Sequence, residues 1–164
     1  MNDAVFPSAG LQRAIERLAN MPVFLGAAIE AADPGELAFR PGEGSFSLTE
    51  QACHLRDLER EGYLVRVKRL LAESEPALEG FDGTAVAKAR DYPAQDARAA
   101  AREFAAARRE LIALIAPLGD SQLAREAVFL GERITLADLV SMVIEHDRSH
   151  REEIEELLDA MESA

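Results

Sequence analysis

The sequence contains one cysteine and no tryptophan among its 164 residues. With Cys53 alone, the chain can form neither an intramolecular disulfide nor a zinc site made of several cysteines. This cysteine content is typical of a reducing compartment, so we expect a cytoplasmic protein. The N-terminus lacks the basic start and apolar stretch of a secretion signal. The longest uncharged apolar stretches, residues 21–29 and 111–119, are too short to cross a bilayer.

Basic residues are few compared with acidic ones. The chain has 18 lysines and arginines against 30 aspartates and glutamates, which gives a net charge of −12. Because such a surface repels phosphate backbones and anionic lipids, we expect no nucleic-acid partner and no membrane partner. Hydrophobic residues make up 48% of the chain. This is a globular composition, and the length fits a single domain over residues 1–164.

The sequence also lacks strand patterns of useful length, whereas apolar residues recur at helical spacing in four segments. These segments cover approximately residues 8–32, 47–73, 95–117 and 135–161. We expect Pro22 to kink or break the first helix. The spacing of Ser47 and Glu50 predicts a capping box at the start of the second helix, and Thr135 with Asp138 predicts a similar cap for the fourth.

The connections between these segments determine the expected topology. Residues 74–93 contain proline and glycine with weak periodicity, which predicts a long connection with one short helical turn near residues 85–89. A connection of about 20 residues can reach ~60 Å, whereas a helix of 25 residues is roughly 37 Å long. The chain can therefore return to the starting end of the bundle. We predict an all-α fold, an up-down-down-up four-helix bundle with a long crossover between helices two and three.

All three histidines of the chain fall on predicted helices. His146 and His150 are one helical turn apart and continue the apolar stripe of the fourth helix, so both should point inward. His54 faces the core from the second helix. One interpretation is core histidines that are satisfied by carbonyl groups. The other is a metal site, in which the i, i+4 pair and a third imidazole hold an ion and leave positions open for water or substrate.

Several other side chains near these histidines have two interpretations. Asp57 and Asp147 lie three residues from His54 and His150, where each would either accept a proton from an imidazole or be a solvated carboxylate. We expect Cys53 to be a small core residue. Alternating charges on the third helix predict a solvated face that includes Arg98, Arg102, Arg108 and Arg109. A di-iron site is disfavoured because Gln51, which is not a carboxylate, precedes His54 by three residues.

Several short motifs, taken together in chain order, resemble one protein family. They are Phe46-Ser47-Leu48-Thr49-Glu50, Cys53-His54-Leu55-Arg56-Asp57-Leu58-Glu59, Gly80-Phe81-Asp82, Arg90-Asp91-Tyr92, Phe104 with Arg108-Arg109-Glu110-Leu111, Gly131 with Thr135-Leu136, and His146-Asp147-Arg148-Ser149-His150 followed by Ile154. On these residues the chain resembles the DinB-like (DinB/YfiT) superfamily of metal-binding four-helix bundle proteins. It departs from the family pattern at Phe46, where tryptophan is common, and at Glu152 and Glu153, where many members have Gly then Gln.

The resemblance implies that His54, His146 and His150 bind one divalent metal ion (Zn, Ni or Fe) in a homodimer that acts on a small-molecule substrate. Characterised relatives include transferases and isomerases that use a low-molecular-weight thiol. We therefore expect either a thiol-dependent S-transferase or a metal-dependent hydrolase. The alternative is a non-catalytic dimeric module for binding or stress response, with a structural or vestigial metal site. Glu153 would be an acceptor beside the site or would alter substrate choice.

Overall fold

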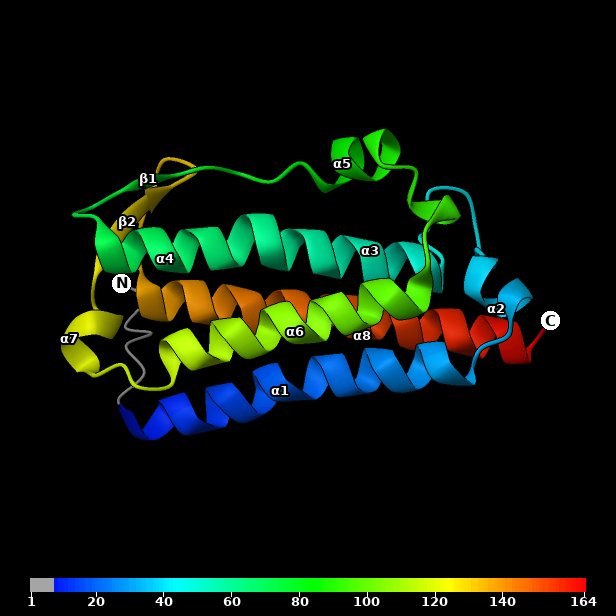
Figure 1. The fold of residues 1–164 in the computed structure, drawn as a ribbon, viewed down its shortest axis with the longest axis horizontal. Helices are drawn as coiled ribbons and strands as arrows, with labels where there is room; N and C mark the ends of the chain where they lie inside the picture. Colours follow the sequence, from blue (N-terminus) through cyan, green and yellow to red (C-terminus); the bar gives the residue numbers. More distant parts are fainter. Residues whose placement is uncertain (1–7) are drawn as a thin grey trace.

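The computed structural model describes residues 8–164, and four long helical segments dominate it (Figure 1). The second segment is continuous through a π-helical turn, η1. The segments are α1 (Ser8–Ala31), α3 (Leu48–Leu58) with η1 (Glu59–Tyr63) and α4 (Leu64–Ala72), α6 (Ala97–Ile115), and α8 (Leu136–Glu162). The predicted four-helix bundle is confirmed. No helix in the described part of the chain is long and apolar enough to cross a membrane.

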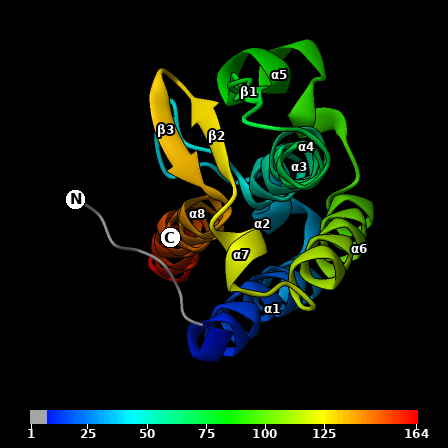
Figure 2. The same ribbon diagram turned by 90° about the vertical axis from the view of Figure 1, so that its left-hand side faces the viewer.

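The four segments lie around a common axis, in the order α1, α6, α3 with α4, and α8 (Figure 2). Figure 1 shows α1 and α8 running in one direction along the long axis, and α3, α4 and α6 running in the other. Helix α6 packs against both α1 and α3. The chain between α4 and α6 therefore travels back along the length of the bundle.

That crossover carries more regular structure than the sequence indicates. It contains strand β1 (Ala77–Leu78), helix α5 (Gly83–Ala89) and the 3₁₀ turn η2 (Tyr92–Ala94). The helical turn predicted near residues 85–89 is part of α5 and is confirmed. A short helix, α2 (Pro34–Ala38), also interrupts the connection before α3.

The mostly helical fold also contains a small three-stranded sheet, for which the sequence shows no strand pattern. Strand β2 (Glu126–Phe129) pairs in parallel with β1 and antiparallel with β3 (Glu132–Thr135), after the short helix α7 (Asp120–Leu123). Strands of two to four residues are too short to show a period of two. The hairpin turn consists of Leu130 and Gly131, both with positive φ (51° and 83°). Because leucine is rare in this turn type, the turn gave no signal.

The helix starts agree with the sequence, and of the two outcomes expected at Pro22, a kink or a break, the break does not occur. Helix α1 continues through Pro22. Its buried residues Leu18 and Leu25 lie on either side of the proline and keep the helix packed on the bundle. The capping boxes at Ser47 and Thr135 are both confirmed. They fix the first turns of the two helices that carry the histidines.

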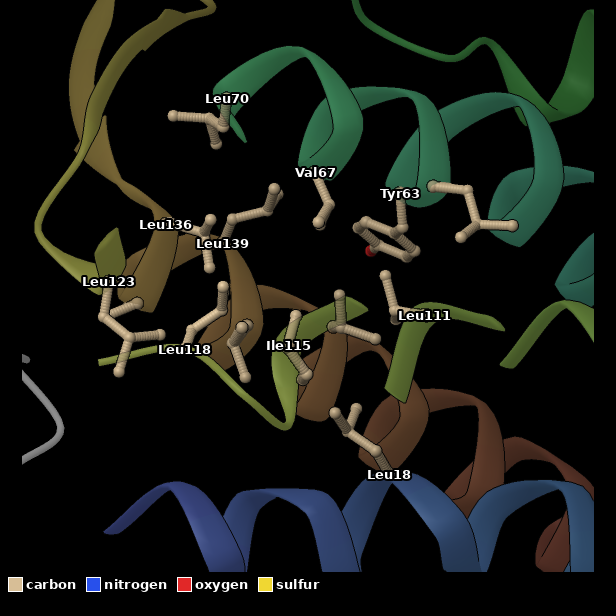
Figure 3. Close-up of a cluster of buried hydrophobic side chains, with 14 of the residues drawn as sticks. Leu18, Tyr63, Val67, Leu70, Leu111, Ile115, Leu118, Leu123, Leu136 and Leu139 are labelled. Carbon is tan, nitrogen blue, oxygen red and sulfur yellow. The ribbon is translucent and has the colours of Figure 1, made fainter. Parts of the chain in front are cut away.

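The core is divided into two apolar clusters along the bundle. One lies toward the sheet and includes Leu70, Leu111 and Leu136 (Figure 3). The other lies toward the opposite end and includes Phe104 and Ile154. Cys53 is fully buried in this second cluster, so its prediction as a core residue is confirmed. The polar side chains of Glu59, Arg108 and Asp147 are buried at the boundary between the two clusters.

Candidate metal centre

The three histidines converge on one point inside the bundle. One nitrogen from each of His54, His146 and His150 lies within 4.8 Å of the others. The Nε2 atoms of His54 and His146 are 3.4 Å apart. The ring centroids of His146 and His150 are separated by 4.3 Å. The structure thus places all three predicted residues together, and their role as metal ligands stays a prediction.

Two helices supply the three rings. His54 lies in the second turn of α3, whose start is fixed by hydrogen bonds between Ser47 and Glu50. His146 and His150 lie on the same face of α8 because four residues make slightly more than one helical turn. The edge of the Tyr63 ring packs against His146, with centroids 5.9 Å apart. Helix packing therefore determines the arrangement of the three imidazoles.

Burial keeps the three imidazoles uncharged. His54 and His150 are each only 9% exposed. Burial, together with the positive charge of a protonated His150, lowers the pKa of His54 to about 4 and that of His146 to about 3. Burial also lowers the pKa of His150. At neutral pH each ring therefore has a free nitrogen lone pair, and this is the form of imidazole that binds a metal ion.

The geometry fits a divalent ion better than three ordinary core histidines. Two imidazole nitrogens bound to one ion at about 2.1 Å lie roughly 3.0–3.5 Å apart. The separation of 3.4 Å between His54 and His146 falls in this range. Among the described residues, Nδ1 of His54 is the buried side-chain nitrogen or oxygen without a hydrogen-bond partner. Neutral imidazoles satisfied by carbonyls would not leave such an atom.

Gln51 and Glu153 form a hydrogen-bonded chain behind His150. The Oε1 atom of Gln51 lies 2.7 Å from Nδ1 of His150, and its Nε2 donates to Oε2 of Glu153 over 2.8 Å. That oxygen of Glu153 also lies 3.3 Å from Nδ1 of His150. Because both neighbours of Nδ1 accept, Nδ1 carries the proton and Nε2 keeps its lone pair for the site. Gln51 was missed as a functional residue, although its position three residues before His54 places it on the same helix face.

Neither interpretation of the two aspartates was right. Asp57 is buried and accepts hydrogen bonds from Tyr92 and Arg56, both at 2.7 Å. Asp147 is 7% exposed and accepts from Arg108. Each carboxylate is thus neither solvated nor bonded to an imidazole. The sequence placed both aspartates on the helices that carry the histidines, but it did not reveal the arginine and tyrosine partners of the two carboxylates.

A buried charged layer separates the two apolar clusters next to the histidines. Arg108, 1% exposed, forms paired hydrogen bonds with Glu59 (2.6 and 2.9 Å) and with Asp147 (2.6 and 3.0 Å). It also donates to the carbonyl of Leu18. The prediction of a solvated face was wrong for Arg108, while Arg109 is exposed as expected. One guanidinium therefore joins α1, η1, α6 and α8 beside His146.

A cavity of about 550 Å³ leads to the histidine cluster. Its walls come from the loop before α3, the start of α5 and the C-terminal part of α8. The lining residues are Pro41, Gly44, Ser45, Phe46, Gln51, His54, Gly83, Thr84, His150, Glu153, Glu156 and Leu157. A small molecule in this cavity would contact the face that contains His54 and His150.

Gly83 allows α5 to approach the ring of His54. A Cβ atom at this position would lie 2.8 Å from Cε1 and 3.0 Å from Nδ1 of that ring. We expect Gly83→Ala to push the imidazole aside and weaken Zn²⁺ binding by about 10- to 100-fold, the range seen when residues behind metal ligands are changed. Titration against a coloured chelator measures this affinity.

Gly80→Ala is the matched control for this change. It lies on the same crossover, and its added Cβ would meet Leu130 at an ordinary 3.5 Å. It should leave Zn²⁺ affinity unchanged. If both alanine variants bind Zn²⁺ as tightly as the original protein, the close packing of Gly83 on His54 has no bearing on the site.

Comparison with known proteins identifies the family of the chain and a similar solved structure. The family model of the DinB superfamily matches residues 18–154. The structure of YfiT from Bacillus subtilis, described as a probable metal-dependent hydrolase with an unusual four-helix bundle topology, is similar with a TM-score of 0.84 and 25% sequence identity. This match covers 92% of the present chain and 87% of the YfiT chain. No curated protein matches the sequence.

Proposed function

The chain belongs to the DinB superfamily, and from this we propose that it is a metal-dependent hydrolase whose ion is held by His54, His146 and His150. The observation that carries the proposal is the convergence of three neutral imidazoles, of which those of His54 and His150 line a cavity of about 550 Å³. The description of YfiT as a probable metal-dependent hydrolase supports the same class of reaction. Imidazole ligands suit Zn, Ni and Fe.

The number of ligands favours a catalytic site over a structural one. Within residues 8–164, no fourth histidine, cysteine or carboxylate joins the group of three. Structural zinc sites are closed by four protein ligands, whereas catalytic sites use three and keep a position open. A divalent ion bound there would polarise a carbonyl or phosphoryl group and activate water. The cavity gives a small substrate a route to that open side.

The residues around the ligands have separate tasks. The Oε1 atom of Gln51 accepts a hydrogen bond from Nδ1–H of His150. This bond stabilises the tautomer in which Nε2 faces the site. Glu153 accepts from the amide of Gln51 and keeps that side chain in orientation. Phe46 and Leu157 supply apolar wall that excludes water from part of the cavity. We regard Gln51 and Glu153 as positioning residues.

The S-transferase alternative has less support. An anionic low-molecular-weight thiol would enter a cavity whose lining, within the described residues, has two glutamates and no lysine or arginine. Cys53 cannot supply a thiol itself, because it is fully buried and burial raises its pKa to about 11. The hydrolase proposal needs only water as the second reactant.

The test combines metal content with ligand exchange. Chelator-treated protein reloaded with Zn²⁺ or Co²⁺ should bind one ion per chain, unfold at a higher temperature and hydrolyse small activated esters such as p-nitrophenyl acetate. Acetohydroxamate, a neutral metal chelator, should change the visible spectrum of the Co²⁺ form. The hydrolase proposal fails if no ion binds, and a spectrum that acetohydroxamate leaves unchanged would indicate a closed structural site.

A further inference from the structure

The charges that line the cavity all have one sign. Glu153 and Glu156 are acidic, and no lysine or arginine occurs among the lining residues that the structure describes. Among residues 8–164, the hydrogen-bond and ion-pair partners of Glu153 are Gln51 and His150, both uncharged at neutral pH. The neighbouring Glu155, by contrast, pairs with Arg151 outside the cavity. The two cavity carboxylates therefore keep their negative charge toward whatever enters.

Cations near the cavity do not cancel this charge. The adjoining hollow, which shares Phe46 and Thr84 with the cavity, contains Arg40 and Lys88. Arg40 is bound to Glu50 through two hydrogen bonds, so its charge is already balanced. Lys88 lies in that hollow and not in the cavity lining. The glutamates thus determine the sign of the field that a ligand meets.

An independent observation indicates that the cavity is a ligand site and not only an acidic patch. His54 is 9% exposed, lines the cavity and has a buried nitrogen without a hydrogen-bond partner among the described residues. The imidazole cluster thus marks one end of the cavity as the place of reaction. Glu153 adjoins that end through its contact with His150, and Glu156 follows one turn later on α8.

We propose, on the basis of the hydrolase function above, that the substrate is a small ester or amide that carries a primary ammonium group. Glu153 and Glu156 follow His150 by three and six residues on the continuous helix α8, so all three lie on neighbouring turns. At 1.5 Å per residue the backbone positions of Glu153 and Glu156 lie roughly 4.5 and 9 Å along the helix from that of His150, and the Glu153 carboxylate lies 3.3 Å from Nδ1 of His150. The ammonium group would bind at these carboxylates, while the reacting carbonyl lies at the imidazoles.

The test uses three hydroxamates of equal length, which chelate the metal and differ only at the far end. They are 6-aminohexanohydroxamic acid (cation), heptanohydroxamic acid (neutral) and adipic acid monohydroxamate (anion). Titrated into the Co²⁺-loaded protein and followed by its visible spectrum, the cation should bind about tenfold more tightly than the neutral compound, and the anion more weakly than both. Added salt should reduce these differences.

Variants then identify the source of the preference. Glu156→Gln should reduce the ratio between cation and neutral compound several-fold, because it removes one cavity charge without touching the ligands. Glu152→Gln removes the same charge from an exposed position of α8 outside the lining, and it should leave the ratio unchanged. A spectrum that none of the three compounds changes would overturn the hydrolase proposal and this one with it. Equal binding of all three, or equal effects of the two variants, overturns the ammonium proposal alone.

Discussion

Replacing His150 by alanine should reduce the affinity for Zn²⁺ by roughly a hundredfold. Zinc binding to a four-ligand site is worth about 10–16 kcal/mol, or about 3 kcal/mol per ligand, and this corresponds to about two powers of ten. The Zn²⁺-dependent rise in the unfolding temperature should fall in step, since that rise depends on the ratio of free metal to dissociation constant. Thermal unfolding with and without Zn²⁺ measures both effects.

His150 is a favourable ligand to remove because the one neighbouring atom that loses its partner, Oε1 of Gln51, belongs to a residue that lines the cavity, where water can replace the imidazole. Gln51 and Glu153 keep their mutual hydrogen bond of 2.8 Å when the imidazole is gone. The metal-free His150→Ala variant should therefore fold. Ser149→Ala, an exposed neighbour on α8, is the matched control and should keep the full Zn²⁺ response. An undiminished response in His150→Ala would remove this residue from the ligand set.

The helices and their starts could be predicted because they depend on local sequence. The period of 3.6 residues persists over whole helices, and both capping boxes use residues three positions apart. The sheet could not be predicted, because β1 pairs with β2 across about 50 residues and neither strand exceeds four residues. Its turn at Leu130 and Gly131 gave no usual signal. Long-range pairing of short strands leaves almost no trace in local patterns.

The histidine cluster was predictable because it depends on local spacing, whereas its surroundings depend on contacts between helices. The spacing of His146 and His150 is local, and His54 lies on an inward face. The partner of His150, Gln51, comes from another helix and depends on the register between α3 and α8. The interpretation of Arg108 followed the alternating charges around it. A better signal was its position four residues after Phe104 and three before Leu111, on the buried face of α6.

Replacing Arg108 by methionine should destabilise the protein by about 3–5 kcal/mol, because the substitution leaves Glu59 and Asp147 buried without a counter-charge. Urea unfolding of the metal-free protein measures this loss. Arg109→Met is the matched control: the side chain is exposed, and its replacement should change the free energy of unfolding by less than about 0.5 kcal/mol.

The loss of folding stability in Arg108→Met should become larger as the pH rises. Burial already raises the pKa of Glu59 and Asp147, and the guanidinium opposes that rise. Without Arg108 both carboxyl groups have a still higher pKa in the folded state than in the unfolded chain. Such groups favour folding below their unfolded pKa and lose that contribution as pH rises through the folded pKa. The deficit of the variant should therefore be largest at pH 7 and smaller at pH 5, and a deficit that grows on acidification would contradict this explanation.

A triple variant separates stability from positioning in the charged layer. Replacing Glu59 and Asp147 by leucine together with Arg108→Met removes every charge of the layer, and such apolar replacements are often neutral or stabilising. Stability should return toward that of the original protein. The Zn²⁺ affinity should nevertheless be lower than that of the original protein, because Asp147 adjoins His146 and its bonds to Arg108 fix this part of α8 against α6 and η1. Recovery of both properties would show that apolar packing alone holds the histidines in place.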